Sequence, residues 1–152
     1  MNVEANLDRI GIQLEEAPSP VGSYLPYRIT GNLVYLSGAI CLRNGVLEYV
    51  GAVGRERTLE EGIEAAKRCA LNQISTLKSA IGDLGRVRKV VHLAGFVWAV
   101  EGFKDSPKVI NGASDLYAQA FGEAGKHSRA AVSVSGLPGG STVEVQTVFE
   151  IT

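Results

Sequence analysis

The chain has 152 residues and a formal net charge of −1, with 45% hydrophobic and 20% charged residues. This composition excludes a disordered or fibrous chain and predicts one globular domain, residues 1–152. The chain lacks the excess of positive charge that is typical of a nucleic-acid-binding domain, so no nucleic-acid partner is expected. No apolar run approaches the roughly 18 residues that cross a bilayer. The start of the chain lacks the regions of a signal peptide, so we expect a cytoplasmic protein with no membrane partner.

Isolated cysteines and histidines argue against a metal centre. Cys41 and Cys69 form no CxxC pair, and His92 and His127 belong to no HExxH or Cys/His cluster. Two separate cysteines in a cytoplasmic protein are more often buried thiols than metal ligands or a disulfide. The glycine-rich segment 136–141 has no GK[ST] and no following helix, so it fails as a phosphate loop and is interpreted as a hairpin turn.

The first part of the chain predicts a short helix and then an irregular loop. Residues 1–10 form the helix, with Leu7 and Ile10 as its apolar contacts. Residues 17–23 hold two prolines and a glycine, which prevent regular structure there.

Two short strands and a hairpin follow the loop. Residues 24–29 and 33–37 have the strand pattern and flank a turn at residues 30–32. Residues 39–50 contain Asn44-Gly45, and Asn-Gly is a strong signal for a hairpin turn.

The segment 58–81 is the clearest helix. Thr58 and Glu61 have the spacing of a capping box, and Gly82 and Gly85 end the helix. The apolar residues recur every three or four positions, which places them on one face. They are Leu59, Ile63, Ala66, Ala70, Ile74, Leu77 and Ile81.

The segment 87–100 predicts a long strand that is covered on both sides. Past its first residues, both alternating faces are largely apolar, and such a strand is normally buried on both faces. One face holds Val87, Lys89, Val91, Leu93, Gly95, Val97 and Ala99; the other holds Arg88, Val90, His92, Ala94, Phe96, Trp98 and Val100.

The last third predicts a second helix and two strands. The helix covers residues 106–121, with Pro107 in its first turn, where proline is well tolerated. The strands cover residues 130–135 and 142–151.

The predicted order is β-β-(β)-α-β-α-β-β, which indicates a two-layer α+β fold with a mostly antiparallel sheet. Two helices cover only one face of that sheet. Because the strand 87–100 is apolar on both faces, another copy of the sheet is expected to cover the second, and we predict a homo-oligomer.

Two charged residues near the last strands are candidates for chemistry. Arg129 begins an otherwise small and apolar strand, where its guanidinium either reaches solvent or holds a carboxylate with two parallel hydrogen bonds. Glu144 alternates with valines, which is usual for a solvated strand face. If a partner subunit covers that face, burial would raise the pKa of Glu144 towards the range of a general acid or base.

Other polar residues carry less information by themselves. Tyr24 closes the Pro/Gly loop as a core or rim aromatic, and Asn111 lies near the start of the second helix as a surface amide. Ser37 and Ser133 have no GxSxG or His/Asp pattern around them, which excludes a recognisable hydrolase triad.

Four sequence blocks resemble the signature of the RidA/YjgF/UK114 family. Their order and spacing match that signature over nearly the whole chain after residue 16, and together they are specific. The blocks are Ala17–Tyr24, Gly31–Gly38, Ser128–Val132 and Leu137–Val145.

The resemblance implies a chorismate-mutase-like α+β fold and a homotrimer with small-molecule clefts between subunits. It also implies hydrolysis of reactive enamines and imines, of the 2-aminoacrylate type, to 2-keto acids and ammonia without a cofactor. By this resemblance, Arg129 holds the substrate carboxylate and Glu144 positions water and moves a proton. Tyr24 and Ser37 line the cleft, Asn111 lies near it, and backbone groups around Gly38 and Ala131 complete it.

The chain departs from the deaminase branch at Ala131, where that branch usually has a cysteine. Relative to the family it also has an N-terminal extension, residues 1–16, and its second helix resembles a longer, chorismate-mutase-like sub-branch. A trimer that binds small carboxylates or 2-keto acids without turnover is therefore a second hypothesis. Ribonuclease or translation-inhibitor activity, also attached to the family, is a third, and the net charge argues against it. Chorismate mutase activity is not expected, since the matched blocks hold only one arginine for a substrate with two carboxylates.

Overall fold

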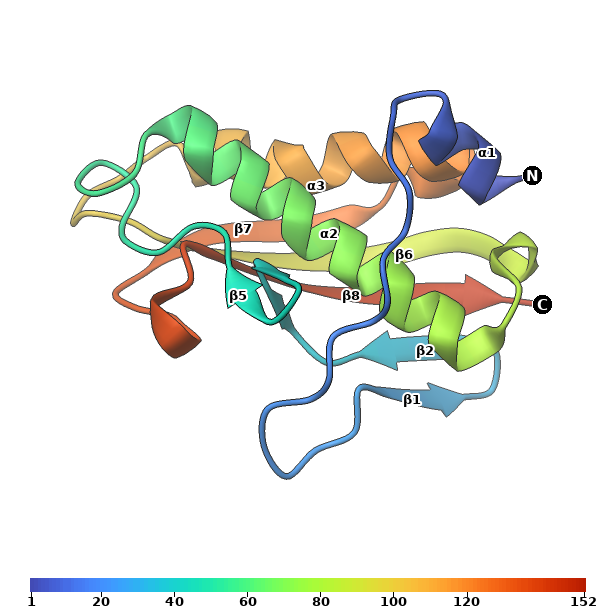
Figure 1. The fold of residues 1–152 in the computed structure, drawn as a ribbon. Coiled ribbons are helices and arrows are strands. Elements are labelled where there is room, and N and C mark those ends of the chain that lie inside the picture. The colour runs from blue at the N-terminus through green and yellow to red at the C-terminus, as the bar shows by residue number, and fades with distance from the viewer.

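The computed structural model describes all 152 residues and has a layer of helices packed on one sheet (Figure 1). The helices are α1 (Val3–Asp8), α2 (Leu59–Ile81) and α3 (Ser106–Phe121), with short 3-10 turns at η1 (Leu84–Arg86), η2 (Gly122–Gly125) and η3 (Pro138–Gly140). The strands are β1 (Tyr27–Thr30), β2 (Leu33–Leu36), β3 (Ala39–Ile40), β4 (Leu42–Arg43), β5 (Val46–Leu47), β6 (Val87–Trp98), β7 (Ser128–Val134) and β8 (Val143–Ile151).

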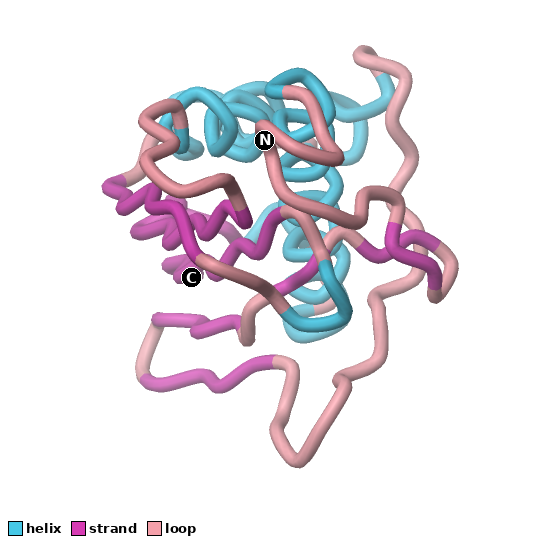
Figure 2. The backbone as a smooth tube through the Cα atoms, turned by 90° about the vertical axis from the view of Figure 1, so that its left-hand side faces the viewer, coloured by secondary structure: helices cyan, strands magenta, loops and turns pink.

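The main sheet has the order β1-β2-β8-β6-β7, and β3 also pairs with β8. Only β6 and β7 run parallel, as expected for two strands joined through α3; every other pair is antiparallel. Figures 1 and 2 show α2 and α3 on the same side of the sheet. The predicted α+β fold, with two long helices on one face of a mostly antiparallel sheet, is confirmed.

Local sequence signals account for the ends of α2. The Thr58 hydroxyl accepts a hydrogen bond from the Glu61 N–H at 3.1 Å, and the Glu61 carboxylate accepts one from the Thr58 N–H at 3.1 Å. This capping box satisfies two backbone donors that the first turn would otherwise leave free. Gly82, at φ 79°, ends the helix in a conformation that only glycine adopts easily.

The hairpin at Asn44-Gly45 forms as predicted, between β4 and β5. Both turn residues have positive φ, 51° and 78°, which is the geometry of a tight hairpin turn and explains the Asn-Gly pair.

The strict alternation expected along β6 is wrong near its beginning. Pairing with β8 shifts register between Val87 and Lys89 and again between Val90 and His92. Such bulges add a residue and move the following side chains to the other face. As a result Val90, expected on the face of Phe96, is buried on the helix face with Leu93.

The N-terminal helix is confirmed, but only one of its two expected contacts is. Val3 and Leu7 are buried, and the Asn6 amide donates to the Ala120 carbonyl of α3 at 2.9 Å. Ile10 is 39% exposed, because the helix ends at Asp8 and the chain turns away before Ile10 can reach the helix layer.

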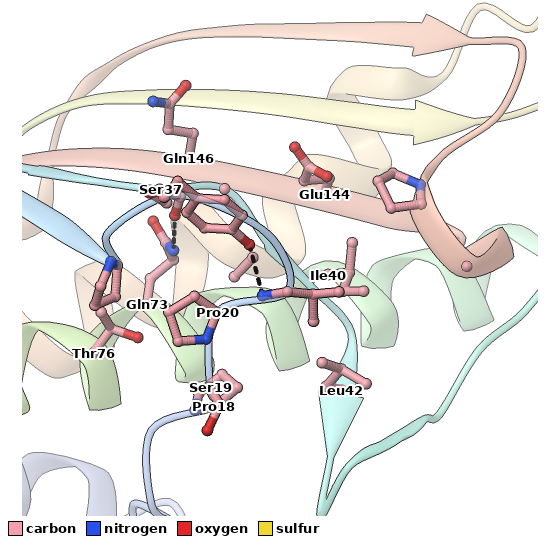
Figure 3. A pocket seen from close by; sticks show the side chains of 17 residues that line it. Pro18, Ser19, Pro20, Ser37, Ile40, Leu42, Gln73, Thr76, Glu144 and Gln146 are labelled. Carbon is pink, nitrogen blue, oxygen red and sulfur yellow. Dashed lines mark hydrogen bonds between the residues drawn. The ribbon is translucent and has the colours of Figure 1, made fainter.

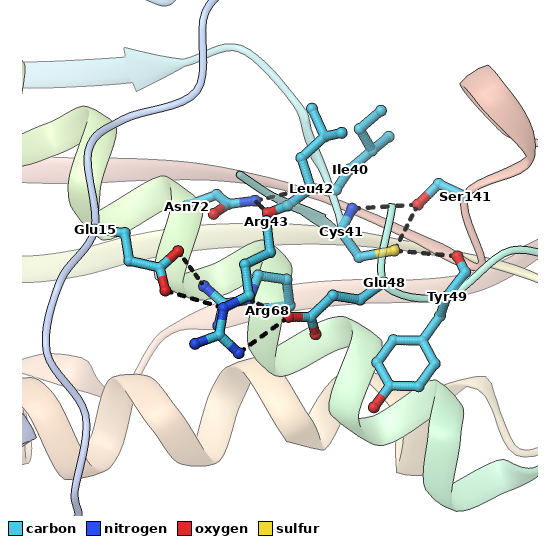
Figure 4. Close-up of polar contacts among 10 residues, drawn as sticks. All are labelled: Glu15, Ile40, Cys41, Leu42, Arg43, Glu48, Tyr49, Arg68, Asn72 and Ser141. Atoms are coloured by element: carbon cyan, nitrogen blue, oxygen red, sulfur yellow. Dashed lines mark hydrogen bonds and ion pairs between the residues drawn. The ribbon is translucent and has the colours of Figure 1, made fainter. Parts of the chain in front are cut away.

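A group of ion pairs, the N-terminal clasp, fixes the chain after α1 (Figure 4). The Glu15 carboxylate accepts from Arg43 Nε at 3.0 Å and lies 3.6 Å from Arg68 Nη1. Glu48 pairs with the same two arginines. The Arg68 side chain is only 13% exposed, so water screens its pairs less than those of a surface arginine. The clasp joins residue 15 to α2 and to the β4–β5 hairpin.

The first predicted strand begins later than expected, at Tyr27 rather than Tyr24. Pro26 has no N–H to give to a ladder, and the Tyr24 hydroxyl accepts from the Val21 N–H at 3.2 Å, which keeps this segment in a turn. Residues 18–26 therefore form a loop beside the sheet.

The sheet is open between β2 and β3. Tyr35 pairs with Val148 and Ala39 with Val145, so three residues on one side face two on β8. The amide of Gln73, from α2, fills the opening: it donates to the Ser37 carbonyl and accepts from the Thr147 N–H, both at 2.9 Å. A side chain thus replaces one rung of the ladder, and it leaves the Ser37-Gly38 backbone free to form a cavity wall.

Replacing Gln73 by leucine should lower the free energy of unfolding by about 2–6 kcal/mol, because one buried and one partly buried backbone group lose their partners at about 1–3 kcal/mol each. Urea denaturation measures this loss. Gln13→Leu is the control: this amide is exposed and makes no hydrogen bond, so its substitution should change stability by less than about 0.5 kcal/mol. Equal effects of the two substitutions would contradict the structural role of Gln73.

Candidate functional site

A cavity of about 580 Å³ lies where the N-terminal loop passes the opening in the sheet (Figure 3). Five parts of the chain form it: the loop 18–26, the turn between β2 and β3, the middle of α2, the η3 turn, and β8. Its lining residues are Pro18, Ser19, Pro20, Val21, Tyr24, Pro26, Ser37, Gly38, Ala39, Ile40, Leu42, Gln73, Thr76, Pro138, Gly139, Glu144 and Gln146.

Glu144 is the only ionisable carboxyl group of the cavity. It lies on β8 opposite Phe96, on the sheet face that the helices leave open, and is half-buried. It has no hydrogen-bond or ion-pair partner within the chain. Burial therefore raises the pKa of Glu144 above its ordinary value of 4.5, since nothing offsets the lost hydration of the charged form. A raised pKa lets the carboxyl group hold a proton more readily than a free one, which suits a group that accepts and returns a proton.

Gly38 leaves the room that the Glu144 carboxyl group occupies. A Cβ atom at position 38 would lie 2.5 Å from Glu144 Oε2, closer than any side chain permits. The carboxyl group therefore lies directly against the backbone at the opening between β2 and β3.

Tyr24 and Ser37 also line the cavity, as expected. The Tyr24 ring packs over Gly22, and its hydroxyl accepts from the Val21 N–H, which shapes the loop into a wall. The Ser37 hydroxyl donates to the Leu25 carbonyl at 2.6 Å and ties the same loop to the end of β2. Tyr24, Ser37, Gly38 and Glu144 thus meet in one protomer.

The sequence prediction missed several lining residues, among them Gln73 and Thr76. Both lie on α2, and Gln73 interrupts the stripe of buried apolar residues between Ala70 and Leu77. A buried amide on an apolar stripe normally has backbone partners, and that signal was present in the sequence. No comparable feature of the sequence indicated that Pro18, Pro20 and Pro26 line a cavity.

Arg129 lies outside the cavity, on the edge strand β7. Its Nη1 donates to the Ser114 hydroxyl at 3.0 Å and its Nη2 to the Pro107 carbonyl at 3.1 Å. Both partners belong to α3 and both are neutral. The half-buried guanidinium has no carboxylate partner in the chain, so its charge is free for an anionic ligand.

The sheet separates Arg129 from Glu144. Arg129 is paired with Leu93, which is buried beneath the helices, whereas Glu144 is paired with Phe96 on the opposite face. Paired residues of neighbouring strands point to the same side of a sheet. One protomer therefore holds the two charged groups on opposite faces, with β6 between their strands.

Asn111 and Ala131 lie on the side of Arg129. Asn111 is exposed on α3, and Ala131 packs against the hydrophobic core beneath it. The predicted site residues thus form two groups: Tyr24, Ser37, Gly38 and Glu144 around the cavity, and Arg129, Asn111 and Ala131 beside α3.

No three His, Cys, Asp or Glu side chains gather in a group that could hold a metal ion. Cys41 and Cys69 are buried free thiols in the core. No helix is long and apolar enough to cross a bilayer.

Comparison with known proteins identifies the relatives of this fold. Residues 4–151 match the family model described as "YjgF/chorismate_mutase-like, putative endoribonuclease". The chain is 41% identical to Protein TCP17 of Trypanosoma cruzi over 150 residues, which are 98% of this chain and 94% of the relative.

Solved structures agree with that match. A protein of unknown function from Agrobacterium tumefaciens is 39% identical with a TM-score of 0.93, over 99% of this chain and 92% of that one. A protein from Shewanella oneidensis, described as a putative endoribonuclease, is 34% identical with a TM-score of 0.96, over 99% and 100%. RidA from a Psychrobacter species is 26% identical with a TM-score of 0.64, over 92% and 98%. By sequence and by fold, the chain belongs to the RidA/YjgF family.

Proposed function

We propose that this protein forms a homotrimer whose subunit clefts hydrolyse small reactive enamines and imines to 2-keto acids and ammonia. The observation that carries the proposal is a pair of half-buried opposite charges, Arg129 and Glu144, each without an oppositely charged partner in its own protomer. Half-buried charges are normally compensated. A ligand that joins a carboxylate to a hydrolysable centre would use both, if two protomers place them around one cleft.

The uncovered face of the sheet supports such an assembly. It displays a set of half-buried or exposed apolar side chains from four neighbouring strands, and single chains rarely leave so many together. Arg129 lies on the edge strand β7, at the margin of the sheet, where a second copy can approach its guanidinium. The apolar set comprises Tyr35, Ala94, Phe96, Trp98, Val132 and Val148.

The chemistry needs only these two charged groups and one water. The guanidinium of Arg129 holds the substrate carboxylate, and an enamine that takes a proton from solvent on carbon becomes the iminium. The Glu144 carboxylate removes one proton from water as the water oxygen bonds to the iminium carbon and the C=N electron pair moves to nitrogen. Glu144 then gives this proton to the amine nitrogen; the hydroxyl proton passes to the Glu144 carboxylate as the C=O bond forms, the C–N bond breaks and ammonia leaves, and Glu144 releases that proton to solvent. An oriented water and one proton carrier suffice because the imine carbon is already electrophilic.

Binding without turnover is a second candidate, favoured by Ala131. The deaminase branch that the sequence resembles usually has cysteine there, and in this chain the position is a small apolar residue packed on the core. Titration calorimetry with pyruvate and a hydrolysis assay with 2-aminoacrylate together separate the two candidates. A binder without turnover gives heat of binding with the keto acid, but 2-aminoacrylate is hydrolysed in its presence no faster than in buffer.

Ribonuclease activity is a third candidate, which rests on the words of the family description. The net charge of −1 gives little attraction for a phosphate backbone. Cleavage of RNA by highly purified protein, lost in Glu144→Gln, would favour this candidate over the deaminase.

The assembly can be tested by placing a charge on the open face. Light scattering of the wild type should give three times 16.1 kDa, and Phe96→Glu should give smaller species because each interface would bury an unpaired carboxylate. Val46→Glu is the control, since Val46 is 68% exposed on the separate β4–β5 hairpin. A wild type that remains at 16.1 kDa would remove the proposed cleft.

Turnover can be tested with 2-aminoacrylate generated in situ and keto-acid release as the signal. Arg129→Ala should raise KM, and Glu144→Gln should lower kcat by about 10²–10⁴-fold, the usual contribution of a general acid–base group. Glu150→Gln is the matched control: it is half-buried on the same face of β8, but Lys89 pairs with it at 3.2 Å. The deaminase proposal fails if wild type and Arg129→Ala release keto acid at the same rate.

The pH dependence follows from the raised pKa of Glu144. The carboxylate is the active form in the attack by water, so kcat should fall as pH decreases through this pKa. Because burial raises the pKa, the fall should begin above pH 4.5, the ordinary value. A kcat–pH profile checks this, and the residual activity of Glu144→Gln should lack the same limb. A limb retained in that variant would assign it to another group.

A further inference from the structure

We propose that Ser114 and His127 are positioning residues that hold the Arg129 guanidinium ready for a carboxylate without using its charge. The inference rests on the proposed role of Arg129 as the carboxylate-binding group. Three contacts form one chain of hydrogen bonds. Arg129 Nη1 lies 3.0 Å from Ser114 Oγ, Ser114 Oγ lies 3.0 Å from His127 Nε2, and His127 Nδ1 lies 2.8 Å from the Gly125 carbonyl oxygen.

If the imidazole is neutral, the two ends of this chain fix the direction of every hydrogen bond in it. A guanidinium only donates, so Ser114 Oγ accepts from Arg129. A carbonyl only accepts, so His127 Nδ1 carries a proton and donates to Gly125. In the neutral imidazole the other nitrogen is then an acceptor, and the Ser114 hydroxyl donates to it. For a neutral ring, the geometry thus selects the tautomer with its proton on Nδ1.

The surroundings of His127 favour the neutral ring. Burial lowers the pKa of this imidazole below 6.5, and electrostatic interactions with Arg129 and His92 lower it further, while the Gly125 carbonyl acts in the opposite direction. The Tyr117 ring packs edge-on at 5.8 Å between ring centroids, and burial raises the pKa of the Tyr117 hydroxyl, which keeps it neutral. No carboxylate makes a hydrogen bond or ion pair with this group.

Gly125 places the far end of the chain of hydrogen bonds. A Cβ atom at this position would collide with the Tyr117 carbonyl, so only glycine lets η2 approach α3 this closely. That approach directs the Gly125 carbonyl at His127, two residues before Arg129. Both neighbours of the imidazole are therefore held by α3 or by the turn that follows it.

A neutral partner has a consequence that an acidic one would not. An aspartate at position 114 would also hold the guanidinium, but it would satisfy the positive charge and compete with any ligand carboxylate. The Ser114 hydroxyl and the Pro107 carbonyl restrain two nitrogens of Arg129 and leave both its charge and its remaining N–H groups for the ligand. The ligand class that fits is a small 2-keto or 2-imino acid, bound through its carboxylate.

The effect should appear in binding and not in the chemical step. Ser114→Ala and His127→Phe should each raise KM for the imine about 10- to 100-fold and change kcat less than about 2-fold, because a guanidinium that is no longer held in place binds the carboxylate less well in the ground state and the transition state alike. Ser114→Thr keeps the hydroxyl and should restore the wild-type KM. His127→Phe keeps a ring against Tyr117, so packing is preserved.

Ser133→Ala is the matched control. Its hydroxyl bonds to Ser106 and so also links β7 to α3, but it does not contact Arg129. It should leave KM unchanged. In wild-type protein with ¹⁵N-labelled histidine, NMR should show His127 neutral at pH 7 with its proton on Nδ1.

Each outcome decides a different point. If the wild type turns over the imine, or binds pyruvate by calorimetry, while Ser114→Ala has the wild-type KM or Kd, the positioning role is wrong and the proposed function stands. An Nε2–H tautomer at His127 overturns it as well. If the wild type neither turns over nor binds pyruvate, the proposed function fails, and the positioning role fails with it.

Discussion

The position of two unpaired charges on opposite faces of one sheet is the constraint on which the functional interpretation depends. Arg129 and Glu144 belong to strands that both flank β6, yet the register directs one side chain towards the helices and the other away from them. No rotation of either side chain brings them together through a sheet. Neither charge has an oppositely charged partner within the chain to offset the hydration that it loses by burial. The association of protomers that we propose would bring both charges to one cleft and would also cover the apolar face around Glu144.

The opening between β2 and β3 connects the fold to the site. A continuous ladder would bring Ser37 and Gly38 into line with β8 and remove the space in which the Glu144 carboxyl group lies. Gln73 prevents this by occupying the missing rung with its amide. Asn72, the neighbouring residue, donates to the Ile40 and Leu42 carbonyls and fixes the chain where pairing resumes. Helix α2 thus covers the core with one set of residues and holds the cavity open with another.

Much of this architecture follows from local sequence signals. The capping box at Thr58, the Asn44-Gly45 turn and the helical spacing in α2 predicted their elements because neighbours in sequence determine each of them. The bulges of β6 depend on its pairing with β8, some 60 residues away, so they could not be read from alternation. The family resemblance named Arg129 and Glu144 as candidates but not their separation by the sheet, because a sequence motif does not say which face of a sheet a residue occupies. Sequence patterns did not single out Gln73, Ser114 and His127 either, because only the fold brings their hydrogen-bond partners near.

Three arginines of this chain differ in whether their partners are charged or neutral. In the N-terminal clasp, Glu15 and Glu48 raise the pKa of Arg43 and neutralise Arg43 and Arg68, which suits residues that join three segments of the fold. Arg129 has the opposite environment, because only a hydroxyl and a carbonyl restrain it. Hydrogen bonds to neutral groups orient a guanidinium without neutralising its charge. An ion pair also orients it, but the negative partner cancels the electrostatic attraction for an anionic ligand. An arginine that is oriented but not neutralised is the expected form of an anion-binding residue, and among these three arginines only Arg129 has that form.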